Sequence, residues 1–244
     1  MMSLAIADKT LLVTGSNRGL GRALVDESLR RGAKRVYAAS RLAMVVGDER
    51  VTPLILDVTD AAQIREADER VESLDILINN AGVSVPDDLS ERSAFERHLA
   101  VNLYGTLDVT RAFLPSLTRS HGAVVNIVSL GAVAAVPVLP AYSVSKAASL
   151  SLTQSLRALL ATRGVSVHAV MPGPIDTDMV RDLDIPKTPA ADVARATLDG
   201  VERGEEEIFP DTMSRMLADR WRAGVAKQLE RQNAELVQAD AIAA

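Results

Sequence analysis

The sequence has no cysteine, which excludes disulfide bridges, thiolate metal sites and cysteine nucleophiles. Histidine is scarce as well. His98, His121 and His168 show no metal-ligand spacing, so we interpret them as structural or exposed and expect no metal site. Basic residues are not in excess, because 27 lysines and arginines face 32 acidic residues and leave a net charge of −5. Nucleic acid is therefore not expected as a partner, since phosphate binding needs a basic face.

Long apolar runs are also absent. No uninterrupted apolar stretch reaches the roughly 18 residues of a membrane helix, and Lys146 and Arg157 interrupt the longest candidate. Met1–Ala7 has no basic region, and its apolar run is too short for a secretory signal. We therefore expect no membrane partner and a cytoplasmic protein. Hydrophobic residues at 48% and charged residues at 24% of the 244-residue chain are typical of a globular protein.

Short apolar or β-branched runs alternate with helix-like segments along the chain. The expected strands are Thr10–Thr14, Arg35–Ser40, Val51–Leu56, Leu74–Asn79, Gly122–Ser129, Val165–Met171 and, weakly, Glu207–Phe209. Polar residues do not alternate with apolar ones in these runs, so both faces of the sheet should be buried. We predict an α/β, Rossmann-like, doubly wound parallel sheet of about seven strands in the order 3-2-1-4-5-6-7, with helices on both faces.

The segments between the strands carry helix signals. The expected helices are Gly19–Arg31, one opened by Asp60 and Gln63 as a capping box, Ser93–Ser120 with a break near Pro115, Ala141–Arg163 with a left-handed cap at Gly164, and one with Pro189 at its first position. Residues 41–50 are too few for a full helix between two strands. We expect a single domain over residues 1–244 with a helical tail over about residues 211–244.

The tail has apolar residues at i, i+4 spacing. They are Met213, Leu217, Trp221, Val225 and Leu229. Such a stripe on a polar helix favours packing against the sheet or another subunit, and a substrate lid is the alternative.

A glycine-rich segment, Thr14–Gly21, links the first strand to the first helix. Glycine is needed where the backbone turns tightly or approaches a ligand closely. The amino end of the helix then offers free N–H groups and a positive dipole end to a pyrophosphate. The residues expected to contact a dinucleotide here are Gly15, Ser16, Asn17, Arg18, Gly19, Leu20 and Gly21.

The end of the second strand indicates which dinucleotide is bound. An NAD site usually places an acid there for the ribose 2′-hydroxyl, but this strand ends in Ser40 and Arg41. Arg18 and Arg41 could both face a 2′-phosphate, a role that suits guanidinium groups. The sequence therefore favours NADP(H) over NAD.

Lys146 is the only charged residue between Ser120 and Leu156. Tyr142 lies four residues earlier, so the two side chains share one helix face. An ammonium stabilises phenolate, and we therefore expect Lys146 to lower the pKa of Tyr142 from about 10 and make it a proton donor or acceptor near neutral pH. Ser129 closes the fifth strand at the carboxyl edge of the sheet, where its hydroxyl could donate to a carbonyl oxygen.

Together these residues resemble the classical short-chain dehydrogenases/reductases up to about Pro210. The resemblance rests on Thr14–Gly21, Asp57-Val58, Asn79-Asn80-Ala81-Gly82, Asn102, Ser129, the Tyr142/Lys146 pair and Pro172-Gly173. It implies that Tyr142 is the catalytic acid/base and that Ser129 holds the substrate oxygen. It further implies that Lys146 bonds the nicotinamide ribose and that Asn102 anchors a water that relays protons.

The resemblance also implies the remaining cofactor contacts, which are Asp57, Val58, Asn80, Ala81, Gly82, Tyr142, Lys146, Pro172, Gly173, Ile175 and Thr177. Asp57 and Val58 would hold adenine, the Asn80–Gly82 turn would pass under the adenosine ribose, and Ile175 and Thr177 would orient the carboxamide. Asn79 is interpreted as structural.

The implied function is an NADP(H)-dependent oxidoreductase of the carbonyl reductase or alcohol dehydrogenase type. Uncharged Leu130–Pro140, with Val133, Val136, Val138 and Leu139, and the later Met179, Val180, Leu183 and Ile185 suggest a small apolar carbonyl or alcohol substrate. The alternatives are an NAD-dependent alcohol or polyol dehydrogenase and a regulator that binds NADP without catalysis. By resemblance we also expect a homo-oligomer, a dimer or tetramer.

Overall fold

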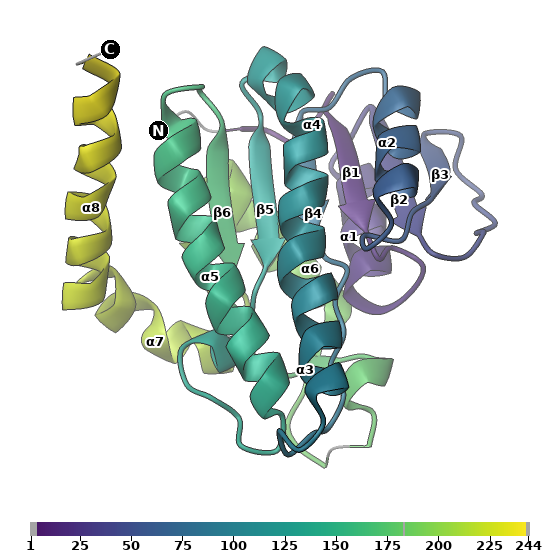
Figure 1. Cartoon of the computed structure of the whole chain (residues 1–244). Helices are drawn as coiled ribbons and strands as arrows, with labels where there is room; N and C mark the ends of the chain where they lie inside the picture. Colours follow the sequence, from purple (N-terminus) through teal and green to yellow (C-terminus); the bar gives the residue numbers. More distant parts are fainter. Residues whose placement is uncertain (1–3, 183, 243–244) are drawn as a thin grey trace.

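A seven-stranded parallel sheet forms the centre of the protein, seen in a computed structural model that describes residues 4–182 and 184–242 (Figure 1). Its order is β3-β2-β1-β4-β5-β6-β9, which confirms the predicted fold. The strands are β1 (Thr10–Thr14), β2 (Arg35–Ser40), β3 (Val51–Ile55), β4 (Ile76–Asn79), β5 (Ala123–Ile127), β6 (Ser166–Val170) and β9 (Glu207–Ile208). Two further short strands, β7 (Ile175–Asp176) and β8 (Thr188–Pro189), pair with each other outside this sheet.

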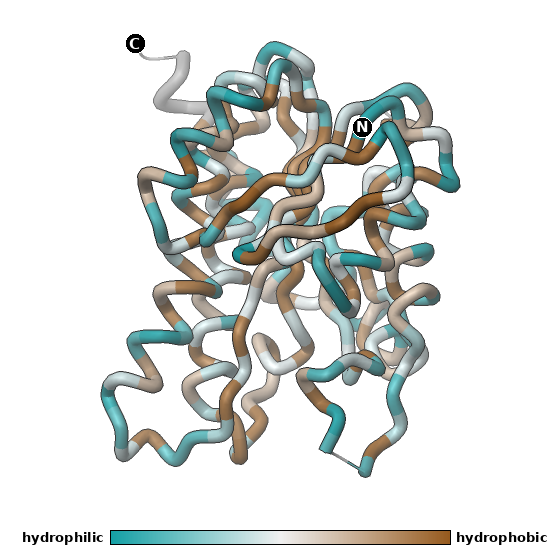
Figure 2. The backbone as a smooth tube through the Cα atoms, turned by 90° about the vertical axis from the view of Figure 1, so that its right-hand side faces the viewer, coloured by the Kyte–Doolittle hydropathy of each residue, from teal (hydrophilic) through white to brown (hydrophobic). Residues whose placement is uncertain are grey.

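Both faces of the sheet are buried, because successive residues of one strand enter different cores. In β1, Leu11 and Val13 join one apolar cluster, while Leu12 joins the other. Helices α1 (Gly19–Arg30) and α6 (Ala190–Glu202) cover the first cluster, and α2 (Ala61–Arg70), α4 (Thr106–Ser120) and α5 (Pro140–Ala161) cover the second (Figure 1). Hydrophobic segments accordingly run through the middle of the molecule (Figure 2).

The long helix before β5 is interrupted, but not where the sequence suggested. It starts as α3 (Arg92–Leu99), passes through a π-helical segment (Ala100–Gly105) and continues as α4 through Pro115 to Ser120. The predicted break near Pro115 is therefore wrong. Pro115 is exposed, so water can satisfy the carbonyl group that the proline ring leaves without a helical partner.

Two other local predictions need correction. The Asp60 carboxylate caps α2 by accepting from the N–H groups of Ala62 and Gln63, but the Gln63 amide oxygen accepts from the N–H of Asp57 instead of closing the box. Pro189 is the residue before α6 and lies in β8, so it is not the first helical residue. The left-handed Gly164 and the absence of a helix over residues 41–50 are confirmed.

The tail consists of two helices, α7 (Thr212–Arg222) and α8 (Val225–Ile242). The turn between them splits the predicted stripe. Leu217 and Trp221 pack against the apolar cluster next to β6, whereas Val225 and Leu229 on α8 are exposed. The fifth stripe residue, Met213 at the start of α7, is half-exposed.

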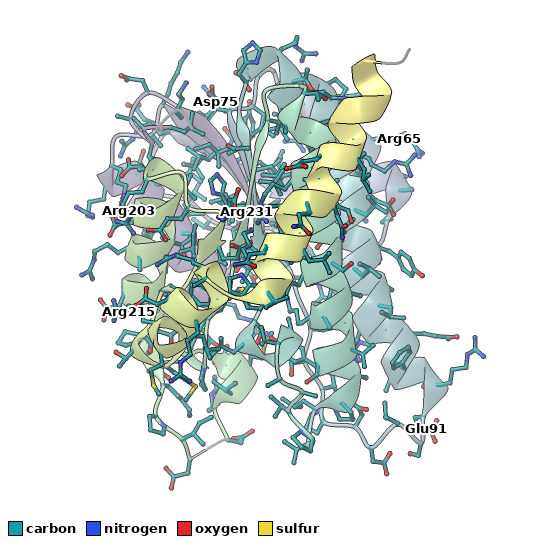
Figure 3. All side chains as sticks on the ribbon, turned by 90° about the vertical axis from the view of Figure 1, so that its left-hand side faces the viewer. Arg65, Asp75, Glu91, Arg203, Arg215 and Arg231 are labelled. Atoms are coloured by element: carbon teal, nitrogen blue, oxygen red, sulfur yellow. The ribbon has the colours of Figure 1, made fainter. Side chains whose placement is uncertain are left out.

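Helix α8 lies alongside α5 (Figure 3), and a buried ion cluster fastens it there. The Lys227 ammonium lies 2.8 to 2.9 Å from carboxylate oxygens of Glu206, Glu207 and Glu230. Arg157 of α5 pairs with Glu207 and Glu230. Ion pairs therefore hold α8 against the rest of the protein, whereas the sequence predicted that the apolar stripe would do so. Nowhere in residues 4–182 and 184–242 does a helix have the length and apolar character needed to cross a membrane.

Candidate active site

A cavity of about 820 Å³ opens at the carboxyl ends of the parallel strands, where α/β sheets of this kind bind ligands. Its walls come from the loops that follow β1, β2, β3, β4, β5 and β6 and from the first turns of α5 and α7. The volume is in the range of sites for drug-sized ligands and cofactors. The long loop after β6 and the segment before α5 gather beyond the strand ends, at the lower end of Figure 1.

The glycine loop is shaped for close approach. Gly15 and Gly19 have φ of +66° and +55°, values that residues with a Cβ atom rarely adopt. A Cβ atom on Gly21 would lie 2.2 Å from the Gly15 carbonyl oxygen. The amino end of α1 follows directly, and Arg18 provides no side-chain cap for its N–H groups. The loop therefore fits a pyrophosphate at the helix end.

The turn after β4 holds this loop in place. The Thr14 hydroxyl accepts from the N–H groups of Asn80 and Ala81, both at 3.0 Å. The Asn80 side-chain amide donates to the carbonyl oxygens of Thr14 and Gly15. Gly82 and Ala81 line the cavity beside it. The Asn80–Gly82 turn is therefore both a wall of the site and a brace for the glycine loop.

Asp57 and Ser40 lie at the end of the cavity expected to hold the adenosine. Asp57 and Val58 follow β3 and line it, although the Asp57 carboxylate already accepts from the N–H and hydroxyl of Thr59. Ser40 and Arg41 line the same region, and the Ser40 hydroxyl donates to the Leu42 carbonyl. No acidic residue stands directly after β2 to take a ribose 2′-hydroxyl.

Arg18 has a partner that the sequence did not indicate. Its guanidinium lies 2.5 Å from the carboxylate of Asp178, in the loop after β7, and Arg181 pairs with the same carboxylate. Both arginines keep the pKa of Asp178 below its usual range. The Arg18 side chain is two-thirds exposed, so surrounding water weakens this pair and leaves the guanidinium available to a phosphate.

Tyr142, Lys146 and Ser129 meet at the other end of the cavity. The Tyr142 hydroxyl is hydrogen-bonded to Ser129, and the Lys146 ammonium lies 5.8 Å from the centre of the Tyr142 ring. Lys146 donates to the Ile127 carbonyl oxygen at 2.8 Å. Tyr142 and Lys146 share one face of α5, and Ser129 follows β5. The spacing in sequence thus places the three polar groups around one point.

The pKa values differ from the expectation. Burial raises the pKa of Tyr142, and the hydrogen bond to Ser129 opposes this only in part. Burial also lowers the pKa of Lys146 to about 8. The prediction that Lys146 acidifies Tyr142 is therefore wrong for the protein by itself. The reason is that the ammonium is beside the ring and bonded to a carbonyl oxygen, while both groups are removed from water.

Asn102 lies behind the cavity wall, in the π-helical segment. Its side-chain oxygen accepts from the N–H of Val83, and its amide donates to the Val83 carbonyl oxygen and the Ser145 hydroxyl. The backbone carbonyl oxygen of Asn102 accepts from the hydroxyls of Thr106 and Ser149. Asn102 therefore connects the segment at Val83 to Ser145 and Ser149 of α5. The water relay that the resemblance implies stays a prediction.

Most of the predicted cofactor residues line this one cavity. They are Gly15, Asn17, Arg18, Gly19, Leu20, Gly21, Ser40, Arg41, Asp57, Val58, Asn80, Ala81, Gly82, Tyr142, Lys146, Pro172, Gly173, Ile175 and Thr177. Ser16 is the exception, because its hydroxyl donates to the Ala39 carbonyl oxygen and its side chain faces a smaller cavity between α1 and the loop of residues 41–50.

Arg97 of α3 and residues of the tail also belong to the site, although sequence reasoning did not place them there. Met213 lines the cavity at the start of α7. Asp211, which is buried, ties this turn to Gly173 by accepting its N–H at 2.8 Å, and it caps α7 through the N–H of Ser214. The only sequence signal was the position of Met213 at the head of the apolar stripe.

The expected substrate walls are present in part. The apolar residues lining the cavity include Val136, Leu139, Met179, Val180 and Ile185. Val133 and Val138 are exposed and lie outside the lining, and position 183, named with them, is outside the described residues. Among the described residues no group of histidine, aspartate and glutamate could hold a metal ion.

Comparison with known proteins decides the family. Residues 9–187 match the family model for short chain dehydrogenases. The chain belongs to the short-chain dehydrogenase/reductase family. It is 35% identical over 195 residues to an uncharacterized oxidoreductase of Staphylococcus saprophyticus, covering 73% of this chain and 83% of that protein.

Two solved structures show the same architecture. One is a short chain dehydrogenase from Burkholderia cenocepacia in complex with NADP, which has 35% identity and a TM-score of 0.86 and covers 94% of this chain and 98% of that one. The other, a 3-ketoacyl-(acyl-carrier-protein) reductase from Brucella melitensis complexed with NADH, has 23% identity and a TM-score of 0.77, and covers 84% and 97%. The second likeness concerns the fold alone. This short-chain dehydrogenase is an NAD(P)-dependent oxidoreductase, and its glycine loop fits the cofactor's pyrophosphate.

Proposed function

We propose that this short-chain dehydrogenase is an NADP(H)-dependent carbonyl reductase that acts on small apolar ketones or aldehydes and also catalyses the reverse oxidation. One observation carries the proposal: a glycine cradle and a Ser129–Tyr142–Lys146 cluster line the same cavity. A protein that only senses a nucleotide has no need for a proton donor hydrogen-bonded to a serine at the far end of the site.

When bound, the nicotinamide cofactor supplies the hydride that adds to the carbonyl carbon. The side chains supply the other half of the reaction. Ser129 and Tyr142 donate hydrogen bonds to the carbonyl oxygen, and Tyr142 transfers its proton to that oxygen as charge develops. The product is the alcohol and the oxidised cofactor. The raised pKa of Tyr142 keeps the phenol protonated near neutral pH, which favours its role as an acid in the direction of reduction.

The preference for NADP(H) over NAD rests on charge. Arg41 lines the cavity directly after β2, and Arg18 reaches it from the glycine loop. Two guanidinium groups and no adjacent carboxylate after β2 favour a 2′-phosphate over a free ribose hydroxyl. The Burkholderia cenocepacia relative, whose structure holds NADP, supports the same preference.

Apolar side chains in the lining of the cavity support an uncharged substrate. Val136, Leu139 and Ile185 line the cavity from two loops, and Met213 lines it from the tail. These four side chains bury a hydrocarbon group well, and none of them offers a charged partner to a phosphorylated or polyanionic compound.

Consumption of reduced cofactor across a panel of carbonyl compounds tests the proposal. We expect apolar ketones to be reduced faster than phosphorylated sugars.

Met213→Ala enlarges the cavity and should raise kcat/KM for bulky relative to small ketones by about tenfold. The reason is that even one methylene group more or less in an apolar pocket changes transition-state binding by about 1–3 kcal/mol. Met216→Ala, at an exposed position one turn further along α7, is the matched control. A preference of the wild-type protein for polyanionic substrates, or an unchanged ratio in the Met213 variant, would contradict the substrate class.

The pH dependence should report Lys146. Because kcat/KM reflects groups of the free enzyme, reduction is expected to fall as pH rises through about 8, where Lys146 loses its proton. Tyr142 cannot cause this fall, since its pKa is raised and it remains a phenol there. Lys146→Arg, whose charge persists at high pH, should remove the fall whatever its absolute rate. If kcat/KM of the wild-type enzyme stayed constant well above pH 8, the expectation that reduction needs a protonated Lys146 would be contradicted.

A further inference from the structure

His98 is a buried histidine with no part in the chemistry described so far. It lies in the last turn of α3, and its side chain is inaccessible to solvent. Its Nε2 atom accepts the N–H of Val85 at 3.1 Å, so the proton of the neutral ring is on Nδ1. Nδ1 in turn is 2.7 Å from the Ala94 carbonyl oxygen, to which it donates. Both ring nitrogens therefore have a backbone partner, and the ring has one fixed orientation.

The imidazole packs directly against the proton donor. The ring centres of His98 and Tyr142 are 6.5 Å apart and their planes meet at 72°, an edge-to-face arrangement. Ser129 bonds the hydroxyl end of the same phenol. The phenol is therefore held by the serine at its oxygen and by the imidazole at its ring.

His98 also fixes the segment Val83–Asp87, which runs from the cavity wall to the helix that carries Tyr142. Asn102 clamps the N–H and the carbonyl of Val83, and His98 binds the N–H of Val85. The Asp87 carboxylate lies 3.3 and 3.4 Å from the N–H of Ala141 at the start of α5, where a negative charge is favourable. The bond to His98 is the middle one of three attachments of this segment.

We propose that His98 is a positioning residue that sets the place of the Tyr142 phenol, both by ring contact and through the Val83–Asp87 segment. The inference deepens the proposed function and rests on it for its kinetic consequence. Proton transfer needs the phenol oxygen close to the substrate oxygen, and an error of about 1 Å in such a placement costs roughly 10²-fold in rate. His98 itself touches no substrate and transfers no proton.

Three substitutions separate the two hydrogen bonds. His98→Gln retains an acceptor near the position of Nε2, His98→Asn retains a donor near Nδ1, and His98→Leu retains neither. We expect kcat to fall by about 10- to 100-fold in His98→Leu and His98→Asn. In His98→Gln, which restores the acceptor for the Val85 N–H but not the ring contact with Tyr142, kcat should recover in part, and KM for NADPH should stay within about twofold in all three variants. Equal kcat in all three variants and the wild type would overturn the proposal.

His168→Leu is the matched control. His168 is equally buried, in β6, and it too bonds a backbone carbonyl oxygen, that of Glu205, but it has no ring contact with Tyr142. Both leucine variants should lose thermal stability, and only His98→Leu should lose kcat. A loss of kcat that follows the loss of stability equally in both variants would show a general structural role and overturn the proposal.

A measurement independent of turnover keeps the two proposals apart. The chain has three tyrosines, so NMR of protein labelled at tyrosine Cζ gives three signals, and Tyr142→Phe identifies the one from Tyr142. That signal should shift in His98→Leu and stay in place in His168→Leu. An unmoved Tyr142 signal in His98→Leu overturns the positioning role even if the enzyme is active. A shifted signal in a protein that reduces no carbonyl compound supports the positioning role and refutes the proposed function.

Discussion

Tyr142→Phe is expected to lower the rate of carbonyl reduction by roughly 10²- to 10⁴-fold, the range attributed to general acid catalysis. The substitution removes only the phenolic oxygen, so the ring still packs against His98 and the cavity keeps its shape. Binding of NADPH, measured by quenching of protein fluorescence or by calorimetry, should change by no more than about twofold. The reason is that the hydroxyl bonds Ser129 and faces the reacting end of the cavity.

Ser129→Ala is the companion variant, since it removes the other donor to the substrate oxygen. We expect a loss of about 10²-fold, in the range for one donor of an oxyanion site. Tyr104→Phe serves as the control, because Tyr104 is exposed and lies outside the cavity lining. If Tyr142→Phe retained full activity, another residue would have to supply the proton, and the proposed chemistry would fail.

The second large effect concerns the choice of cofactor. The double variant Arg18→Ala/Arg41→Ala should lower kcat/KM for NADPH by about 10²-fold or more, while kcat/KM for NADH should stay within a few-fold of the wild-type value. Hydrogen bonds to charged groups contribute about 1.5–3 kcal/mol each, and 1.4 kcal/mol corresponds to a factor of ten. NADH has no 2′-phosphate and so loses nothing from either guanidinium.

Arg195→Ala is the control for net charge, because Arg195 is an exposed residue of α6 paired with Asp192.

The single variant Asp178→Asn should change the affinity for NADPH in the opposite direction. Removing this carboxylate frees Arg18 from its ion pair, so affinity for NADPH should rise modestly. Equal losses for NADPH and NADH in the double variant would contradict the assignment of the two arginines to the 2′-phosphate.

Local patterns predicted the parts of the site that depend on local geometry. The i, i+4 spacing of Tyr142 and Lys146 requires only that α5 is a helix, and the glycine loop requires only that a strand and a helix meet there. Ser129 follows from its place at the end of β5. The burial of both strand faces follows from the apolar runs, and the sheet order follows from the alternation of strands and helices.

Contacts between distant segments could not be predicted. The contact of His98 with Tyr142 depends on how α3 enters its π-helical continuation, and the bond from Asp211 to Gly173 depends on how the tail returns to the sheet. The ion pair of Arg18 with Asp178 joins two loops. Desolvation decided the pKa values of Tyr142 and Lys146, and the sequence spacing that suggested their interaction carries no information on it.

Transfer of deuterium from labelled cofactor tests the central claim most directly. NADPH carrying deuterium at the reactive carbon of its nicotinamide ring is incubated with the enzyme and an apolar ketone, and the alcohol is analysed by mass spectrometry. We predict one deuterium on the carbinol carbon with the wild-type enzyme and almost none with Tyr142→Phe in the same time. If no apolar ketone acquires deuterium from the wild-type enzyme, although NADPH binds to it, the account of this protein as a carbonyl reductase is contradicted.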